Sequence, residues 1–66
     1  MKLSKTEVFC LMADKDLTMK ALAGMADLSF ETTSKAIKGF EVSARTAGKI
    51  ARALGVNTFD IIEVGE

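Results

Sequence analysis

The sequence predicts a compact all-α domain of five short helices. Apolar residues recur at helical spacing along most of the chain, and residues that start or stop helices bound each recurring stretch. Proline is absent, which is typical of a mostly helical chain because proline breaks helix interiors. Strands have little support.

The first helix is predicted from about Lys5 to Asp14. Ser4 stands before it and Glu7 follows three positions later, which is the spacing of a capping box. The residues expected on its buried face are Val8, Leu11 and Met12, with Phe9 on the flank.

The stretch from Leu17 to Gly39 reads as two amphipathic helices, over residues 18–25 and 30–38. Thr18 is the expected N-cap of the first and Ser29 begins the second, which ends at Gly39 in the left-handed region. Only about three residues, 26–28, remain for the connection, so the two helices must meet at a steep angle. This is the shape of a DNA-reading helix-turn-helix.

The two faces of the second motif helix differ in character. The residues expected to face inward are Thr33, Ala36 and Ile37. The residues expected to face outward are Phe30, Glu31, Thr32, Ser34, Lys35 and Lys38.

Two further helices complete the prediction. Ser43 is the expected cap of the fourth helix and Gly55 its stop. Its inner stripe is predicted to be Ala47, Ile50, Ala51 and Leu54. Thr58 is expected to cap a short last helix that carries Phe59, Ile61 and Ile62.

Thirteen residues fall without a gap at the places of a known pattern: Leu17, Thr18, Leu22, Ala23, Ser29, Ser34, Gly39, Ile50, Ala51, Ala53, Leu54, Gly55 and Val56. On these residues the chain resembles the phage-repressor and Cro-type helix-turn-helix family, also called the xenobiotic-response-element type. The resemblance covers nearly all of the chain and implies a lambda-repressor-like DNA-binding domain over residues 1–66.

Four positions depart from the family pattern. Met19 replaces the usual Gln or Glu that opens the first motif helix, and Asp27 replaces the turn glycine. Asp27 can still adopt the left-handed conformation at modest cost. Thr33 replaces an Ile, which suggests a thinner core, and Ile37 replaces a glutamate.

The resemblance implies that the second motif helix enters the major groove and that Phe30, Glu31 and Lys35 meet base edges. Phe30 suits a thymine methyl, Glu31 accepts from cytosine N4, and Lys35 donates to guanine. Residues implied to contact base or backbone are Thr32 and Ser34, and those implied to contact the backbone are Thr18, Lys38 and Arg45.

Each of these residues also has a simpler interpretation. Glu31 is favourable beside a helix N-terminus through the helix dipole alone, and Thr18 is sufficiently explained as an N-cap. Lys35 and Lys38 are ordinary solvated lysines in many helices. Phe30 is equally suited to the core or to a protein interface.

The charge balance limits the strength of DNA binding. Nine basic and nine acidic residues cancel, whereas a domain that depends on phosphate contacts is usually positive. The distribution of the charged residues along the chain partly compensates for the zero net charge. The basic residues in or after the second motif helix are Lys35, Lys38, Arg45, Lys49 and Arg52, and the acidic residues near the C-terminus are Asp60, Glu63 and Glu66.

Composition narrows the remaining classes. The chain has Cys10 as its one cysteine and no histidine, which excludes internal disulfides, the usual zinc-ligand clusters and the common catalytic constellations. Cys10 is expected to be a small buried hydrophobe. No cofactor, metal, catalytic residue or membrane span is predicted, and the expected compartment is the cytoplasm. A chain of 66 residues also lacks room for an effector domain, so no small-molecule effector is expected.

Two functions follow from these observations. The preferred one is a sequence-specific transcriptional regulator, a repressor from a phage or bacterium, that binds double-stranded DNA as a homodimer. The resemblance places the dimer interface at Val56, Phe59 and Ile62, with Val64. The alternative is a protein-interaction module on the same fold, such as an antirepressor, a repressor modulator or an antitoxin. The start methionine and the short tail are those expected of a whole protein.

Overall fold

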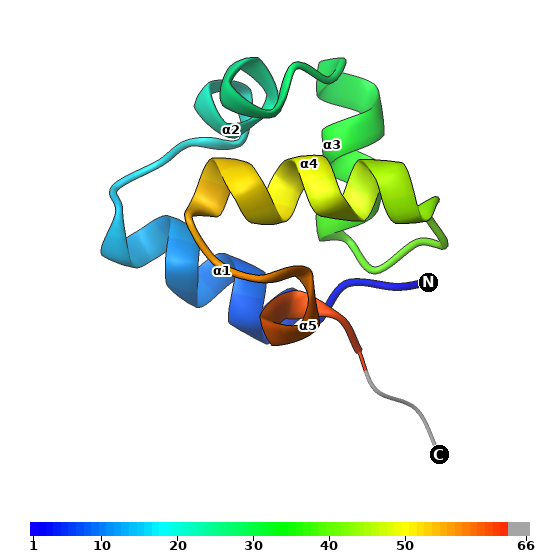
Figure 1. Ribbon diagram of the computed structural model, residues 1–66. Helices are drawn as coiled ribbons and strands as arrows, with labels where there is room; N and C mark the ends of the chain where they lie inside the picture. Colours follow the sequence, from blue (N-terminus) through cyan, green and yellow to red (C-terminus); the bar gives the residue numbers. More distant parts are fainter. Residues whose placement is uncertain (64–66) are drawn as a thin grey trace.

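Five α-helices and no named strand make up residues 1–63, which are the residues that the computed structural model describes. The helices are α1 (Lys5–Asp14), α2 (Met19–Ala26), α3 (Phe30–Ile37), α4 (Ala44–Leu54) and α5 (Thr58–Ile61). Val64 and Glu66 lie outside the described residues. The all-α prediction is confirmed, and each motif helix agrees with its predicted range to within one residue. Figure 1 shows α4 crossing the molecule, with α2 on one side and α1 and α5 on the other.

Four predicted N-caps are confirmed by their hydrogen bonds. Each side-chain oxygen accepts from the backbone N–H three residues later: Ser4 from Glu7 at 3.4 Å, Thr18 from Ala21 at 3.1 Å, Ser29 from Thr32 at 3.0 Å and Ser43 from Thr46 at 3.2 Å. These bonds satisfy backbone donors that the helix itself leaves unpaired. Gly39 and Gly55 adopt the predicted left-handed conformation, with φ of 92° and 76°.

The predicted cap of the last helix is wrong by one residue. Asn57, not Thr58, is the N-cap of α5. The Asn57 backbone N–H donates to the Asp60 carboxylate at 3.2 Å, and the Asp60 N–H donates to the Asn57 carbonyl at 3.0 Å. Thr58 has Ile61 three positions later, which offers no acceptor for such a bond, so the reciprocal pair selects Asn57.

The core lies between α4 and the other helices. Its fully buried members on α4 are the predicted ones, Ala47, Ile50, Ala51 and Leu54. On α1, Val8 and Met12 are buried and Leu11 is half-buried. Cys10 is exposed, which corrects the expectation that it is buried. It lies about 200° around the helix from Val8, on the side that faces away from the core.

The inner face of α2 is formed by one leucine and two alanines. Leu22, Ala23 and Ala26 are buried, whereas Ala21 and Met25 are exposed. The small alanines let α2 approach both α3 and α4. Met25 is consequently left at the surface beside α4.

The N-terminal segment, which has no helical pattern, ties together two distant parts of the chain. Leu3 is buried and forms an isolated antiparallel bridge with Ile62. The Ser4 N–H donates to the Ile61 carbonyl at 2.6 Å. At the other end, the Val42 N–H donates to the Met1 carbonyl at 2.8 Å, which holds the loop between α3 and α4.

Candidate nucleic-acid interface

The exposed face of α3 carries all three residues predicted to contact bases. Phe30 is 56% exposed, and Glu31 and Lys35 are also exposed. The opposite face holds α3 in place, because Thr33, Ala36 and Ile37 are all fully buried as predicted. The helix therefore presents a polar and aromatic surface on a fixed backbone. Thr32 and Ser34, also predicted to face outward, are half-buried.

Glu31 and Lys35 form an ion pair along α3. The Lys35 Nζ lies 3.6 Å from the Glu31 carboxylate, one turn away, and both side chains are largely exposed. Exposed pairs of this kind contribute little to stability, about 0.3–0.5 kcal/mol. Either side chain can therefore exchange its partner for a ligand at small cost.

The turn between α2 and α3 fixes how α3 projects from the fold. Asp27 adopts the left-handed conformation, with φ of 58° and ψ of 46°, in the place where the family pattern has glycine. The Leu28 N–H donates to the Ala23 carbonyl at 3.0 Å and closes the end of α2. Ser29 then begins α3 directly.

The loop after α3 brings an aromatic residue to the surface that the sequence interpretation missed. Phe40 follows Gly39 and is 55% exposed. Its backbone N–H donates to the Lys35 carbonyl at 3.1 Å, so the ring is held close to the end of α3. The sequence offered one signal for this exposure. Phe40 is a large apolar residue in a loop, where no helical neighbour would bury it.

The same loop is held electrostatically. The N-terminal ammonium of Met1 pairs with the Glu41 carboxylate and also donates to the Val42 carbonyl at 3.0 Å. The hydrogen bond and the charge of this ammonium hold the pKa of Glu41 below its ordinary value of 4.5.

The three residues predicted to contact the backbone lie on different elements. Thr18 is the exposed N-cap of α2, Lys38 is the exposed C-cap of α3, and Arg45 is exposed in the first turn of α4. Each lies at a helix end. This spread suits contacts that set orientation rather than read bases.

The charged residues of α4 are all basic: Arg45, Lys49 and Arg52. Their spacing of four and three residues places them on one stripe, opposite the buried one. We call this the basic stripe of α4.

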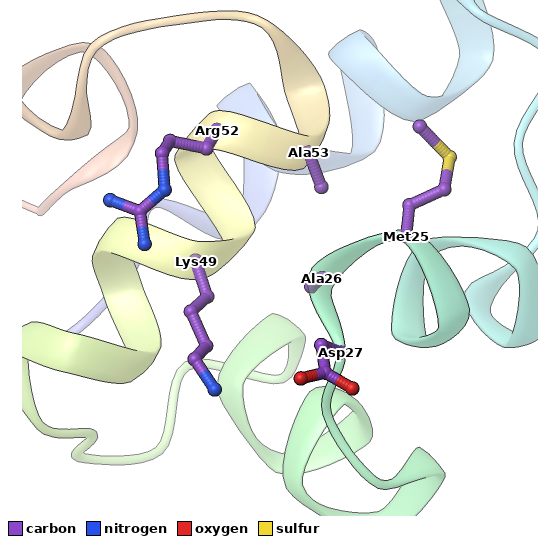
Figure 2. A pocket seen from close by; sticks show the side chains of 6 residues that line it. All are labelled: Met25, Ala26, Asp27, Lys49, Arg52 and Ala53. Atoms are coloured by element: carbon purple, nitrogen blue, oxygen red, sulfur yellow. The ribbon is translucent and has the colours of Figure 1, made fainter.

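A pocket of about 290 Å³ lies beside the basic stripe of α4, between α4 and the end of α2. It is lined by Met25, Ala26, Asp27, Lys49, Arg52 and Ala53. Figure 2 shows Lys49 extending from α4 toward the side where Asp27 lies. The pocket thus combines apolar side chains with charged groups at its rim.

The residues predicted to form a dimer interface differ in exposure. Val56 and Ile62 are half-buried and pack against the core of their own chain. Phe59 is 73% exposed, which leaves most of its ring in solvent.

Residues 1–63 lack two further classes of feature. In that range no helix is long and apolar enough to cross a membrane. No group of three or more potential metal ligands occurs in the described part of the chain.

Comparison with known protein families supports the nucleic-acid interpretation. The model of the Cro/C1-type HTH DNA-binding domain matches residues 10–65. This range includes both motif helices, the turn between them and α4. No curated protein and no solved structure matches the chain at a significant level.

Proposed function

The chain belongs to the Cro/C1-type HTH DNA-binding domain family, and on this basis we propose that it is a sequence-specific repressor that reads the major groove with α3. Membership makes it a DNA-binding regulator in general terms, in a family of regulatory rather than enzymatic domains. The proposal adds three points: which residues read the bases, that the chain binds as a homodimer, and that it represses transcription. A regulator of this kind must reach the DNA, which favours the cytoplasm of a bacterial host as its compartment.

The exposed face of α3 is the observation that carries the proposal. Phe30, Glu31 and Lys35 all lie in solvent on a helix whose other face is fully buried. In the groove, Phe30 packs on a thymine methyl, Glu31 accepts from cytosine N4 and Lys35 donates to guanine O6 or N7. The weak Glu31–Lys35 pair opens when each meets a base. Thr32 and Ser34, which are half-buried on α3, contact base or backbone.

Contacts to the DNA backbone would orient α3. Thr18, Lys38 and Arg45 stand at the ends of three different helices, with Lys38 at the end of α3 itself. Their contacts carry no sequence information, but they set the register in which α3 meets the bases. Repression then follows from occupying promoter DNA.

A homodimer would supply the affinity that charge does not. The chain is neutral overall, so each copy gains little from counterion release. Two copies bound at adjacent half-sites combine their contacts. The exposure of Phe59, which lies three residues from both Val56 and Ile62, supports a dimer surface at the C-terminal part of the fold.

A salt-dependent titration tests the proposal. Fluorescence anisotropy of a random duplex is measured at about 50 and 200 mM salt, a range over which phosphate-dependent affinity changes strongly. We expect binding that weakens steeply as salt rises. No binding at the lower salt concentration would contradict the proposal.

Exposed aromatic residues favour one alternative function. Phe30 and Phe40 are both more than half exposed, on a chain with no net charge. Exposed aromatic side chains are common anchors of protein interfaces. The alternative is a protein-interaction module, such as an antirepressor, a repressor modulator or an antitoxin. It predicts that DNA binding is weak or absent and that a protein partner binds in its place.

A further inference from the structure

The pocket between α2 and α4 is too small for most ligands but suits one side chain. Its volume is about 290 Å³, near the lower limit of roughly 300–1,000 Å³ that is typical of small-molecule sites. Met25, Ala26 and Ala53 make part of its wall apolar. The charged lining residues are the two cations Lys49 and Arg52 and one acid, Asp27, so positive charge is in excess. The matching occupant is an apolar side chain with a carboxylate beside it.

The chain carries such a group on α5. Phe59 is the most exposed of its large apolar residues, at 73%, and Asp60 follows it directly. Glu63 is also exposed just after α5. We call Phe59, Asp60 and Glu63 the acidic knob.

Charge complementarity favours a second copy of this chain as the partner. The basic stripe of α4 carries three cations and no acid, whereas the charged residues of the knob are all acidic. Opposite surfaces on the same molecule attract when two copies meet, and the net charge of zero removes the long-range repulsion between them.

The knob and the pocket lie on neighbouring parts of the surface. Arg52 lines the pocket, and its guanidinium also lies over Gly48, near the start of α5. A Cβ atom at Gly48 would be 3.5 Å from Arg52 Nη1 and 4.0 Å from Thr58 Oγ1, and Thr58 directly precedes Phe59. Figure 1 shows α4 between α2 and α5. An isologous contact needs both complementary parts within one patch, because each copy gives and receives the same group.

We propose that two copies of the chain associate by exchanging acidic knobs. Phe59 of each copy enters the pocket between α2 and α4 of the other, and Asp60 and Glu63 face Lys49 and Arg52 of that second copy. The inference rests on the proposed homodimer and specifies its interface. It adds the pocket to the surface predicted from the C-terminal residues alone.

Sedimentation equilibrium without DNA tests the interface. The wild-type chain is compared, from about 5 to 500 µM, with two charge-reversal variants and with their equimolar mixture. One variant carries Lys49→Glu with Arg52→Glu and the other carries Asp60→Lys with Glu63→Lys. All four positions are at least partly exposed, but the Asp60 carboxylate also caps α5. Asp60→Asn, which keeps a capping oxygen and removes the charge, is therefore measured beside the second variant, and circular dichroism verifies the fold of each chain. The control is Lys20→Glu with Lys38→Glu, which changes the net charge by the same amount as the first variant, at exposed positions on α2 and at the end of α3 that belong to neither the pocket nor the knob.

We expect the wild type and the control to dimerise within this range, and each variant to bind itself about tenfold more weakly or worse. The mixture should recover a heterodimer, because both knob–pocket contacts between the two variants pair opposite charges. Phe59→Ala should also weaken the dimer about tenfold or more. A wild type that stays monomeric throughout, or variants that dimerise like the wild type, would overturn the proposal.

The test separates the interface from the proposed function. Sedimentation without DNA reports only self-association, and the anisotropy titration reports only DNA binding. A monomer that binds DNA in a salt-dependent way would reject this interface and leave DNA binding intact. A dimer that does not bind DNA would support this interface and contradict the proposed DNA-binding function.

Discussion

The side chains of Ser29 and Thr32 are joined at the first turn of α3. The Ser29 hydroxyl donates to Thr32 Oγ1 at 2.8 Å, and the Thr32 N–H donates to Ser29 Oγ at 3.0 Å. This pair determines where α3 begins. It therefore also sets the position of Phe30 and Glu31, which lie between the two bonded residues.

Removing this cap should weaken both the fold and DNA binding. Ser29→Ala leaves the Thr32 N–H without its partner and should lower the free energy of unfolding by about 1 kcal/mol. Affinity for DNA should fall as well, since the first turn of α3 frays. Ser29→Asn restores a capping oxygen and should recover most of both losses. Urea unfolding and anisotropy measure the two effects, and unchanged stability in Ser29→Ala would contradict the role of the cap.

Lys35 and Lys38 should contribute more to the affinity for DNA than lysines elsewhere in the chain. Lys35→Ala with Lys38→Ala should reduce affinity for duplex DNA about tenfold or more and lower the slope of log K against log salt by about 1–2. Lys2→Ala with Lys5→Ala removes the same charge from another region and serves as the control. An equal loss in the control would show that net charge, rather than the α3 surface, drives binding.

Helix ends were predictable because they depend on local chemistry. Ser4, Thr18, Ser29 and Ser43 all cap as predicted, and each bond joins residues three apart. The error at Asn57 has the same local origin. Both Asn57 and Thr58 are good caps, and the Asp60 carboxylate decided between them.

Features that depend on distant segments could not be predicted in this way. The Leu3–Ile62 bridge joins the two ends of the described chain, and no local sequence pattern predicts it. The pocket beside Lys49 requires the end of α2 to lie against α4. The exposure of Phe40 and Met25 likewise depends on which neighbours the tertiary fold brings near. The α3 surface was predictable because the two faces of one helix follow from its periodicity.

A buried hydroxyl should be a point of weakness in the core. Thr33 is 0% exposed, and its Oγ1 has no hydrogen-bond partner. Thr33→Val replaces this group with a methyl of similar size and should raise the free energy of unfolding by about 1–3 kcal/mol. Thr33→Ser keeps the hydroxyl and removes a methyl, and it should lower stability by about 1 kcal/mol. Urea denaturation measures both variants. A Thr33→Val chain that is less stable than the Thr33→Ser chain would contradict the prediction that the buried hydroxyl destabilises the core.

Two glycines should respond in opposite ways to alanine. Gly24 lies within α2, and a Cβ there would meet no atom within 4 Å, so Gly24→Ala should stabilise by about 0.5–1 kcal/mol. Gly55 has φ of 76°, so Gly55→Ala should destabilise by about 1–2 kcal/mol. Thermal unfolding should show an increase of about 2–8 °C for the first and a decrease for the second. Equal shifts in the same direction would contradict the assigned backbone conformations.

The ion pair between Glu41 and the N-terminal ammonium should make a small part of the stability depend on pH. The pKa of Glu41 is lowered from 4.5 in the folded chain, so the pair stabilises the fold fully above that value. The contribution is lost as the pH falls from 4.5 through the lower folded pKa, where the carboxylate gains a proton. Glu41→Gln should therefore be less stable than the wild type at pH 7 and should approach it in acid. Both groups are exposed, so about 0.5 M salt should reduce the difference at pH 7 as well. Urea midpoints at both pH values measure the effect, and a difference that persisted unchanged into acid would show that Glu41 acts through packing rather than charge.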